Sequence, residues 1–207
     1  MVANVTTRSG QPCPKERLPW HDGQMENPEP PDSYRLNAGA PTEADIDQYR
    51  LLSANAAAGV GVVSTSWRGR DYAATVTGHL SVSYDPPTML VSLYGESRIA
   101  EAVAESGTWA LSLLTGRQQG IANWLASPGT PLEGLLTQVP YRRGAASGAV
   151  IVDNALAHFE LRTRQIHPAA THLLVVGEVL TMGSAASGAD ELDPLVHFGS
   201  AYYRLDR

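Results

Sequence analysis

The first regular pattern of apolar positions in the chain has the spacing of a helix. Apolar residues recur every three or four positions between Ile46 and Ala56. Just before them, Thr42 is followed three positions later by Asp45, which is the signature of a capping box at a helix start. The pattern therefore predicts a first helix over residues 43–56.

Short runs rich in apolar and β-branched residues follow this helix, and Gly or Pro separates them. The segment 59–67 (GVGVVSTSW) has the composition of a strand. Residues 68–71 then form a turn into a second strand, 71–83 (DYAATVTGHLSVS), which predicts a hairpin. Two prolines at 86–87 separate it from a third strand, 88–94 (TMLVSLY).

A second helix is predicted from its two end signals. Ser97 is a good N-cap, and Gly107 stands where a left-handed residue commonly ends a helix. Strands outnumber helices and their turns are short, which predicts a mainly β fold, a closed antiparallel barrel with peripheral helices. The remaining predicted elements are a strand at 108–114, a helix at 117–126, a Gly/Pro-rich loop at 127–148, and strands at 157–167, 171–183 and within 194–205.

Length and proline content divide the chain into two parts. At 207 residues and 43% hydrophobic content it can form one domain with a substantial core, here residues 42–207. Seven of the 14 prolines fall in residues 1–41, which predicts an extended N-terminal arm. The arm is either disordered or lies against a partner subunit through Trp20, Met25 and Tyr34.

Charge and cysteine content narrow the function further. The net charge is −6 with no basic run, which gives no support to nucleic-acid binding. No stretch is apolar enough for a membrane span, and the beginning of the chain has no signal-peptide pattern. Cys13 has no partner for an internal disulfide, so we expect a reducing, cytoplasmic location.

The chemically most informative segment runs from Thr75 to Arg98. It joins hydroxyl-bearing residues, Thr75 and Thr77, to a helix start at Ser97 and Arg98. Free N–H groups, a helix dipole and an arginine at one helix end form an anion site, and a flavin phosphate is an anion of this kind. The same residues are also compatible with a half-exposed strand followed by a capped helix, without a ligand.

Over residues 45–205, the order and motifs of the chain resemble the flavin reductase-like family. The resemblance rests on TVTxxxSVSxDPPxMLVSL, the Ser-Arg pair that opens a helix, WALSLL, HLLVVGEVL and PLVHFGSAYYRL. It implies a Greek-key split β-barrel of the FMN-binding type that forms a homodimer. It also implies NADH- or NADPH-dependent reduction of FMN, with FAD possible, to supply reduced flavin to a separate flavin-dependent monooxygenase.

The resemblance also implies roles for individual residues. Thr75 and Thr77 would lie on the flavin phosphate or ribityl chain, Ser97 and Arg98 on the phosphate, and His172 near the flavin and nicotinamide. The candidate catalytic residues are His172 and His79, and the candidate flavin-binding residues are Thr75, Val76, Thr77, Gly78, His79, Leu80, Ser81, Val82, Ser97, Arg98 and Ser112.

Three departures from the family pattern concern the flavin ring and nicotinamide positions. His79 replaces a frequent aromatic residue, Ser112 replaces an Asn, and Ala170-Thr171 replaces a Gly-Asp pair. Two alternatives therefore stay open. One is an enzyme whose tightly held FMN acts directly on a small organic substrate, and the other is a flavin-binding protein without catalysis.

Other chemistries have no sequence support. The remaining histidines lack HxxxH or HExxH spacing, so we expect no metal site. No GxGxxG follows a strand, and no GxSxG nucleophile motif occurs.

Overall fold

The computed structural model describes residues 39–127, 131–184 and 193–205. Nearly all of the predicted arm lies outside these residues, so the arm and the boundary at residue 42 stay predictions. Residues up to Asp45 and residues from Ile46 onward form two units, which are described separately.

The first predicted helix is confirmed as α1 (Glu43–Ser53). Its capping box is present, because Asp45 Oδ2 accepts hydrogen bonds from Thr42 N at 2.8 Å and from Thr42 Oγ1 at 2.7 Å. In return, Asp45 N donates to Thr42 Oγ1 at 3.3 Å. The helix ends at Ser53, three residues before the predicted end.

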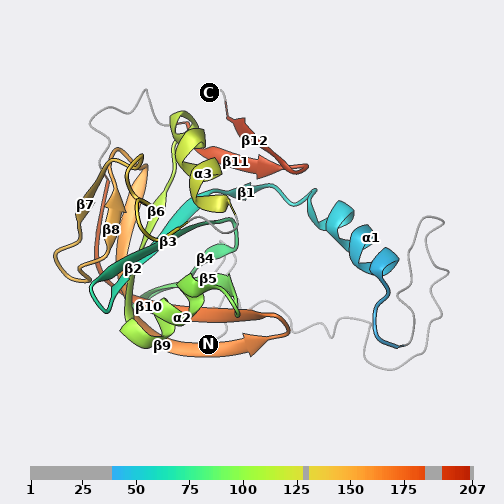
Figure 1. Cartoon of the computed structure of the whole chain (residues 1–207), viewed down its shortest axis with the longest axis horizontal. Helices are drawn as coiled ribbons and strands as arrows, with labels where there is room; N and C mark the ends of the chain where they lie inside the picture. The colour runs from blue at the N-terminus through green and yellow to red at the C-terminus, as the bar shows by residue number, and fades with distance from the viewer. Residues whose placement is uncertain (1–38, 128–130, 185–192, 206–207) are drawn as a thin grey trace, which may run out of the picture. The chain divides into compact units, whose positions relative to one another are not determined.

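A curved, wholly antiparallel sheet of seven strands forms the body of the second unit (Figure 1). It contains the predicted hairpin, whose turn is only Arg68-Gly69, with φ of 49° and 70°. In spatial order the strands are β3 (Arg70–Val76), β2 (Gly61–Trp67), β6 (Thr108–Leu113), β9 (Ala157–Ala169), β10 (His172–Gly183), β5 (Pro87–Tyr94) and β4 (His79–Tyr84).

The prediction of one continuous strand over residues 71–83 was wrong. The segment is divided into β3 and β4, which lie at opposite edges of the sheet. The break falls at Thr77 and Gly78, where Gly78 O accepts a hydrogen bond from Ser92 N at 2.7 Å. A Cβ at Gly78 would lie 3.1 Å from the Ser92 Cβ, so only a glycine lets the two backbones approach this closely without displacement.

Helix α2 (Arg98–Ser106) has the predicted ends. Ser97 is the N-cap, with φ −80° and ψ 145°, and its hydroxyl accepts a hydrogen bond from Ala100 N. Gly107 ends the helix with φ 70°, and its N–H donates to Val103 O. The apolar face of α2, including Ile99 and Val103, is buried against the sheet.

Two hydrophobic cores share the central strands. The larger one lies inside the curve of the sheet and contains Trp109, Leu111, Leu161 and Val175. The smaller one lies under α3 (Gln119–Ala126), which follows a 3₁₀ turn, η1 (Gly116–Gln118). Strand β2 is buried on both faces, because Val63 belongs to the larger core and Val62 to the smaller one. Its buried hydroxyl residues, Ser64 and Thr65, both form hydrogen bonds, to Val150 O and Thr108 O respectively.

Two small sheets complete the fold. Strands β1 (Ala58–Gly59), β11 (Leu195–Phe198) and β12 (Ala201–Arg204) form one of them, close to α3 in Figure 1. The other pairs β7 (Tyr141–Arg143) with β8 (Val150–Val152). The predicted loop 127–148 therefore contains a strand, which the sequence prediction missed.

Candidate functional site

A groove of about 530 Å³ lies where β3, the start of α2 and the end of α3 come together. It contains Ser97 and Arg98, two of the residues predicted to hold a phosphate. Its full lining is Tyr72, Ala73, Ala74, Tyr94, Glu96, Ser97, Arg98, Ile99, Leu125, Ala126, Ser127, Leu132 and Leu135. We call it the α2 groove.

The start of α2 supplies the anion-binding chemistry of this groove. The first N–H groups of a helix have no partner within the helix and carry partial positive charge. Arg98, at the first helical position, adds an exposed guanidinium. The Ser97 hydroxyl already donates to Tyr94 O at 2.6 Å and accepts from Ala100 N at 3.2 Å. The backbone and Arg98 thus fit a phosphate, whereas Ser97 would have to rotate before it could donate to one.

The hydroxyl-bearing residues at the end of β3 differ in their contacts. The Thr75 hydroxyl donates to Ala122 O at 2.8 Å and so ties β3 to α3. The Val76 side chain is part of the larger core, which leaves only its backbone available for a ligand. Thr77 and Gly78 are exposed at the break between β3 and β4. Thr77 is therefore the more accessible of the two predicted threonines.

His79 lies over the glycines on either side of Val60. Its Nε2 is 3.2 Å from Gly59 O, and a Cβ at Gly61 would lie 3.5 Å from its Cδ2. Burial lowers the pKa of His79, and the hydrogen bond with Gly59 only partly offsets this effect. The imidazole is therefore neutral at physiological pH.

His172 borders the α2 groove through an aromatic neighbour. It begins β10, and its ring centroid lies 5.9 Å from that of Tyr94 in an edge-on arrangement. Tyr94 lines the groove and donates its hydroxyl proton to Glu96 Oε2 at 3.0 Å. The His172 Nδ1 is 3.0 Å from the Thr171 hydroxyl.

The two candidate histidines do not form a pair within one chain. His172 pairs with Tyr94 of β5, whereas His79 pairs with Val91, three residues away on the same strand. Directly paired residues point to the same face and successive residues alternate, so the imidazoles lie on opposite faces of the sheet. They are also separated by about 10 Å along β5.

The remaining candidates divide into exposed and buried residues. On the edge strand β4, the side chains of Leu80 and Val82 are 52% and 49% exposed, and Ser81 is exposed as well. By contrast, Ser112 is 1% exposed, and its hydroxyl accepts a hydrogen bond from Val152 N at 3.1 Å. The structure thus gives the Ser112 hydroxyl a structural contact with β8, and a role of Ser112 in flavin binding stays a prediction.

The glycine-rich sequence GAASG at 144–148 encloses a carboxylate of the chain itself. Glu160 Oε2 accepts hydrogen bonds from Ala146 N at 2.9 Å, Ser147 N at 2.6 Å and the Ser147 hydroxyl at 2.7 Å. Thr181 donates to Glu160 Oε1 at 2.7 Å. Backbone N–H groups arranged in this way also bind anions in other proteins, and here Glu160 takes that place.

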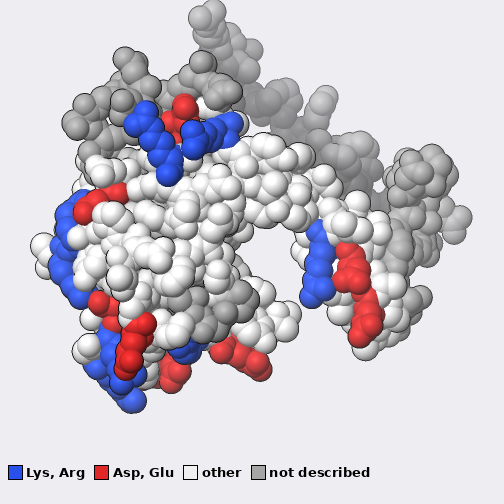
Figure 2. All heavy atoms as spheres, turned by 45° about the horizontal axis from the view of Figure 1, so that its top comes forward, with Lys and Arg blue, Asp and Glu red and all other residues white. Residues whose placement is uncertain are grey.

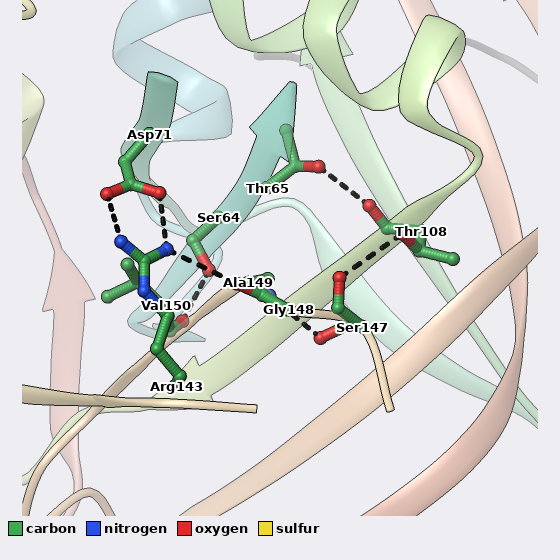
Figure 3. Close-up of polar contacts among 9 residues, drawn as sticks. All are labelled: Ser64, Thr65, Asp71, Thr108, Arg143, Ser147, Gly148, Ala149 and Val150. Atoms are coloured by element: carbon green, nitrogen blue, oxygen red, sulfur yellow. Dashed lines mark hydrogen bonds and ion pairs between the residues drawn. The ribbon is translucent and has the colours of Figure 1, made fainter. Parts of the chain in front are cut away.

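Next to this turn, hydrogen bonds and an ion pair join β7 and β8 to the hairpin of β2 and β3 (Figure 3). Arg143 binds Asp71 through two parallel hydrogen bonds of 2.6 and 2.7 Å and also donates to Gly148 O. The Ser64 hydroxyl donates to Val150 O. These contacts fix the position of β7 beside β3.

Charged side chains of both signs occur in mixed groups on the face shown in Figure 2, with a wide uncharged area between them. Among residues 39–127, 131–184 and 193–205, no group of three His, Cys, Asp or Glu side chains could hold a metal ion. No helix in the same residues is long and apolar enough to cross a membrane.

The fold is that of the flavin-binding split-barrel oxidoreductases. The chain belongs to the flavin reductase like domain family, whose model matches residues 53–206. It is 31% identical to an NADH-dependent FMN reductase, AsuE2, of Streptomyces nodosus subsp. asukaensis, over 79% of this chain and 87% of that protein.

Two further similarities agree with this family. The reductase component of a 4-hydroxyphenylacetate 3-monooxygenase from Thermus thermophilus is 28% identical over 77% of this chain and 96% of its own length. Among solved structures, BorF, the flavin reductase component of a bacterial two-component tryptophan halogenase, superposes with a TM-score of 0.72. It is 30% identical and is covered over its full length, against 79% of this chain.

Sequence reasoning missed most of the walls of the α2 groove. Tyr72 precedes the predicted threonines, and Leu132 and Leu135 come from the segment taken as a simple loop. A signal was present there, because Leu132, Leu135, Leu136 and Val139 have the spacing of an apolar face. These residues pack against α3 in the smaller core, and Leu135 O accepts a hydrogen bond from Trp124 Nε1 at 2.7 Å.

Proposed function

We propose that this protein is an NADH-dependent flavin reductase that supplies reduced flavin to a separate monooxygenase. The observation that carries the proposal is the α2 groove, with Arg98 and the start of α2, in a chain that belongs to the flavin reductase like domain family. Among the proteins reported above, AsuE2 is an NADH-dependent FMN reductase, and the other two are the reductase components of a monooxygenase and of a two-component halogenase, which supports the same function here.

In this proposal the start of α2 and Arg98 hold the flavin phosphate, and Thr77 and β4 lie beside the rest of the flavin. The flavin, FMN or FAD, supplies the hydride acceptor, so the protein needs few acid-base groups. Its own residues bind and orient the two rings and exclude water. His172, next to Tyr94, would orient the nicotinamide or balance negative charge on the reduced flavin.

We also propose a homodimer in the cytoplasm. Strand β4 forms an edge of the seven-stranded sheet and exposes Leu80, Val82 and Tyr84, the last at 92%. A row of exposed apolar side chains on an edge strand is typical of a surface covered by another subunit. Tyr84→Glu should therefore shift the protein toward monomers in sedimentation experiments, whereas an unchanged dimer would place the interface elsewhere. The cytoplasmic location rests on Cys13, the chain's one cysteine.

The direct test is NADH oxidation with and without added FMN or FAD, together with flavin binding by Arg98→Ala. Loss of an exposed charged hydrogen bond should weaken FMN binding about tenfold. Arg68→Ala is the matched control, because Arg68 lies over the Trp67 ring at 4.2 Å and does not line the groove. Equal flavin affinity of the wild type and Arg98→Ala would contradict the phosphate assignment, and absence of flavin-dependent NADH oxidation would contradict the function.

A further inference from the structure

A second groove, of about 480 Å³, follows the α2 groove along β3. Arg70 and Asp71 line the second groove, and the next residues of the strand, Tyr72 to Ala74, line the first. We call the second one the β3 groove. Its lining is Arg70, Asp71, Leu132, Glu133, Gly134, Leu135, Leu136, Thr137 and Tyr141, and both grooves share the walls Leu132 and Leu135.

The charged side chains of the β3 groove differ in whether they already have a partner within the chain. The Asp71 carboxylate is bound on both oxygens by Arg143, as Figure 3 shows, so this pair adds little net charge. The Arg70 side chain, by contrast, is exposed and makes no hydrogen bond or ion pair with any residue that the structure describes. It is therefore the cation that the groove offers to a ligand.

The other walls suit a nucleoside. The guanidinium carbon of Arg143 lies 5.6 Å from the centre of the Tyr141 ring, and this ring is 38% exposed. An exposed aromatic ring can stack on a purine base. Glu133 adds a carboxylate, which is the usual acceptor for ribose hydroxyl groups in nucleotide sites.

From the position and chemistry of these walls, we infer that the β3 groove binds the adenosine monophosphate half of a dinucleotide whose other half lies in the α2 groove. Arg70 contacts the diphosphate, Tyr141 stacks on the adenine and Glu133 accepts a hydrogen bond from the ribose. Both FAD and NADH contain this half. The inference rests on the proposed function, because it takes the phosphate position at the start of α2 as its origin.

The spacing of the two grooves fits such a ligand. Four residue steps separate Ala74, in the α2 groove, from Arg70, and at 3.3 Å per step this is about 13 Å along β3. The Arg70 side chain can extend back along β3 toward the second phosphate of a dinucleotide whose first phosphate lies at the start of α2, and the ribose and adenine then continue into the β3 groove. FMN, which ends at its phosphate, would leave the β3 groove empty.

The test compares Arg70→Ala with Arg68→Ala, which removes the same charge from the turn of the same hairpin. Dissociation constants for FMN, FAD and AMP are measured by fluorescence and calorimetry, along with the KM for NADH when FMN is the acceptor. Arg70→Ala should weaken binding of AMP and of one dinucleotide about tenfold while FMN affinity stays within twofold. Arg68→Ala should change none of these values. Melting temperatures verify that both variants are folded.

The pattern of losses identifies the ligand. A weaker affinity for FAD alone assigns the groove to FAD, and a raised KM for NADH with unchanged flavin affinities assigns it to NADH; either result supports the inference. Unchanged values for AMP and both dinucleotides would overturn it, as would an equal loss for FMN and FAD. A wild-type protein that binds AMP through Arg70 but no flavin would overturn the proposed function and leave the β3 groove as a nucleotide site.

Discussion

Replacement of Glu160 tests whether the GAASG turn is held by a buried charge. Glu160 is 3% exposed and accepts four hydrogen bonds, three on Oε2 and one on Oε1. Glu160→Gln keeps the shape and one acceptor oxygen toward the turn, and the Thr181 hydroxyl can reverse its direction. Glu160→Ala removes every acceptor and leaves two backbone N–H groups, those of Ala146 and Ser147, without a partner.

The two variants should differ in the free energy of unfolding. A hydrogen bond to a charged group contributes about 1.5–3 kcal/mol, and an unsatisfied buried donor costs about 1–3 kcal/mol. Ala146 is exposed, so its N–H can reach water in the alanine variant and the cost stays near the lower limit. We therefore expect a loss of about 1–2 kcal/mol for Glu160→Gln and about 3 kcal/mol for Glu160→Ala, or roughly 6–12 °C in melting temperature for the latter.

The measurement is urea unfolding and thermal melting, with Glu178→Gln as the control. Glu178 stands on the neighbouring strand and forms an ion pair with Arg164, whose side chain is 53% exposed. An exposed pair of this kind contributes about 0–1 kcal/mol. If Glu160→Ala were no more destabilising than Glu178→Gln, the anchoring role of Glu160 would be wrong.

The dependence of stability on pH is a second test of the Glu160 charge. Burial by itself would raise the pKa of Glu160, but the hydrogen bonds from Ser147, Thr181 and Ala146 more than offset burial and lower the pKa below the usual 4.5. Since the folded-state pKa lies below the unfolded one, the stabilisation is present above pH 4.5 and is lost as the pH falls through the folded-state pKa. The stability gap between the wild type and Glu160→Gln should therefore narrow in acid.

Three further predictions concern a cap, a close contact and a titration. Ser97→Ala should lower stability by about 1 kcal/mol in denaturant unfolding through loss of the N-cap, even without flavin. Gly177→Ala should lower the free energy of unfolding by about 1–3 kcal/mol, because the new Cβ would lie 2.8 Å from the Trp109 ring. Gly120→Ala should instead raise it by about 0.5–1 kcal/mol, because Gly120 lies in α3 and a Cβ there would have no atom within 4 Å. In NMR titrations His79 should protonate below pH 6.5, and a midpoint above that value would contradict its burial over the Gly59 carbonyl.

Features determined by neighbours in sequence were predictable here. The capping box of α1 and the two ends of α2 depend on residues three or four positions apart, so Ser97 and Gly107 carried enough information. The division at Gly78 could not be read in this way. It depends on the approach of Ser92 from β5, a contact that appears only when the sheet has curved.

In the candidate site, too, local motifs were predictable from the sequence and long-range contacts were not. Arg98 and Ser97 were identifiable because a helix start is a local motif, and the α2 groove includes both. The walls formed by Tyr72 and Leu135 come from segments more than 20 residues away from that helix start, and only packing brings them together. The pairing of His79 and His172 with different residues of β5 is likewise a matter of strand register, which the sequence does not state.

Because β2 is buried on both faces, the two cores of the second unit should unfold together. Val62 and Val63 are adjacent in the chain but belong to different cores, so neither core can be exposed to water without disturbing the strand that the other core needs. Partial unfolding of one half is therefore costly, and the two cores should melt in a single cooperative transition. The amide protons of β2 should then exchange with solvent only when the whole barrel unfolds, which makes this strand a reporter of global stability.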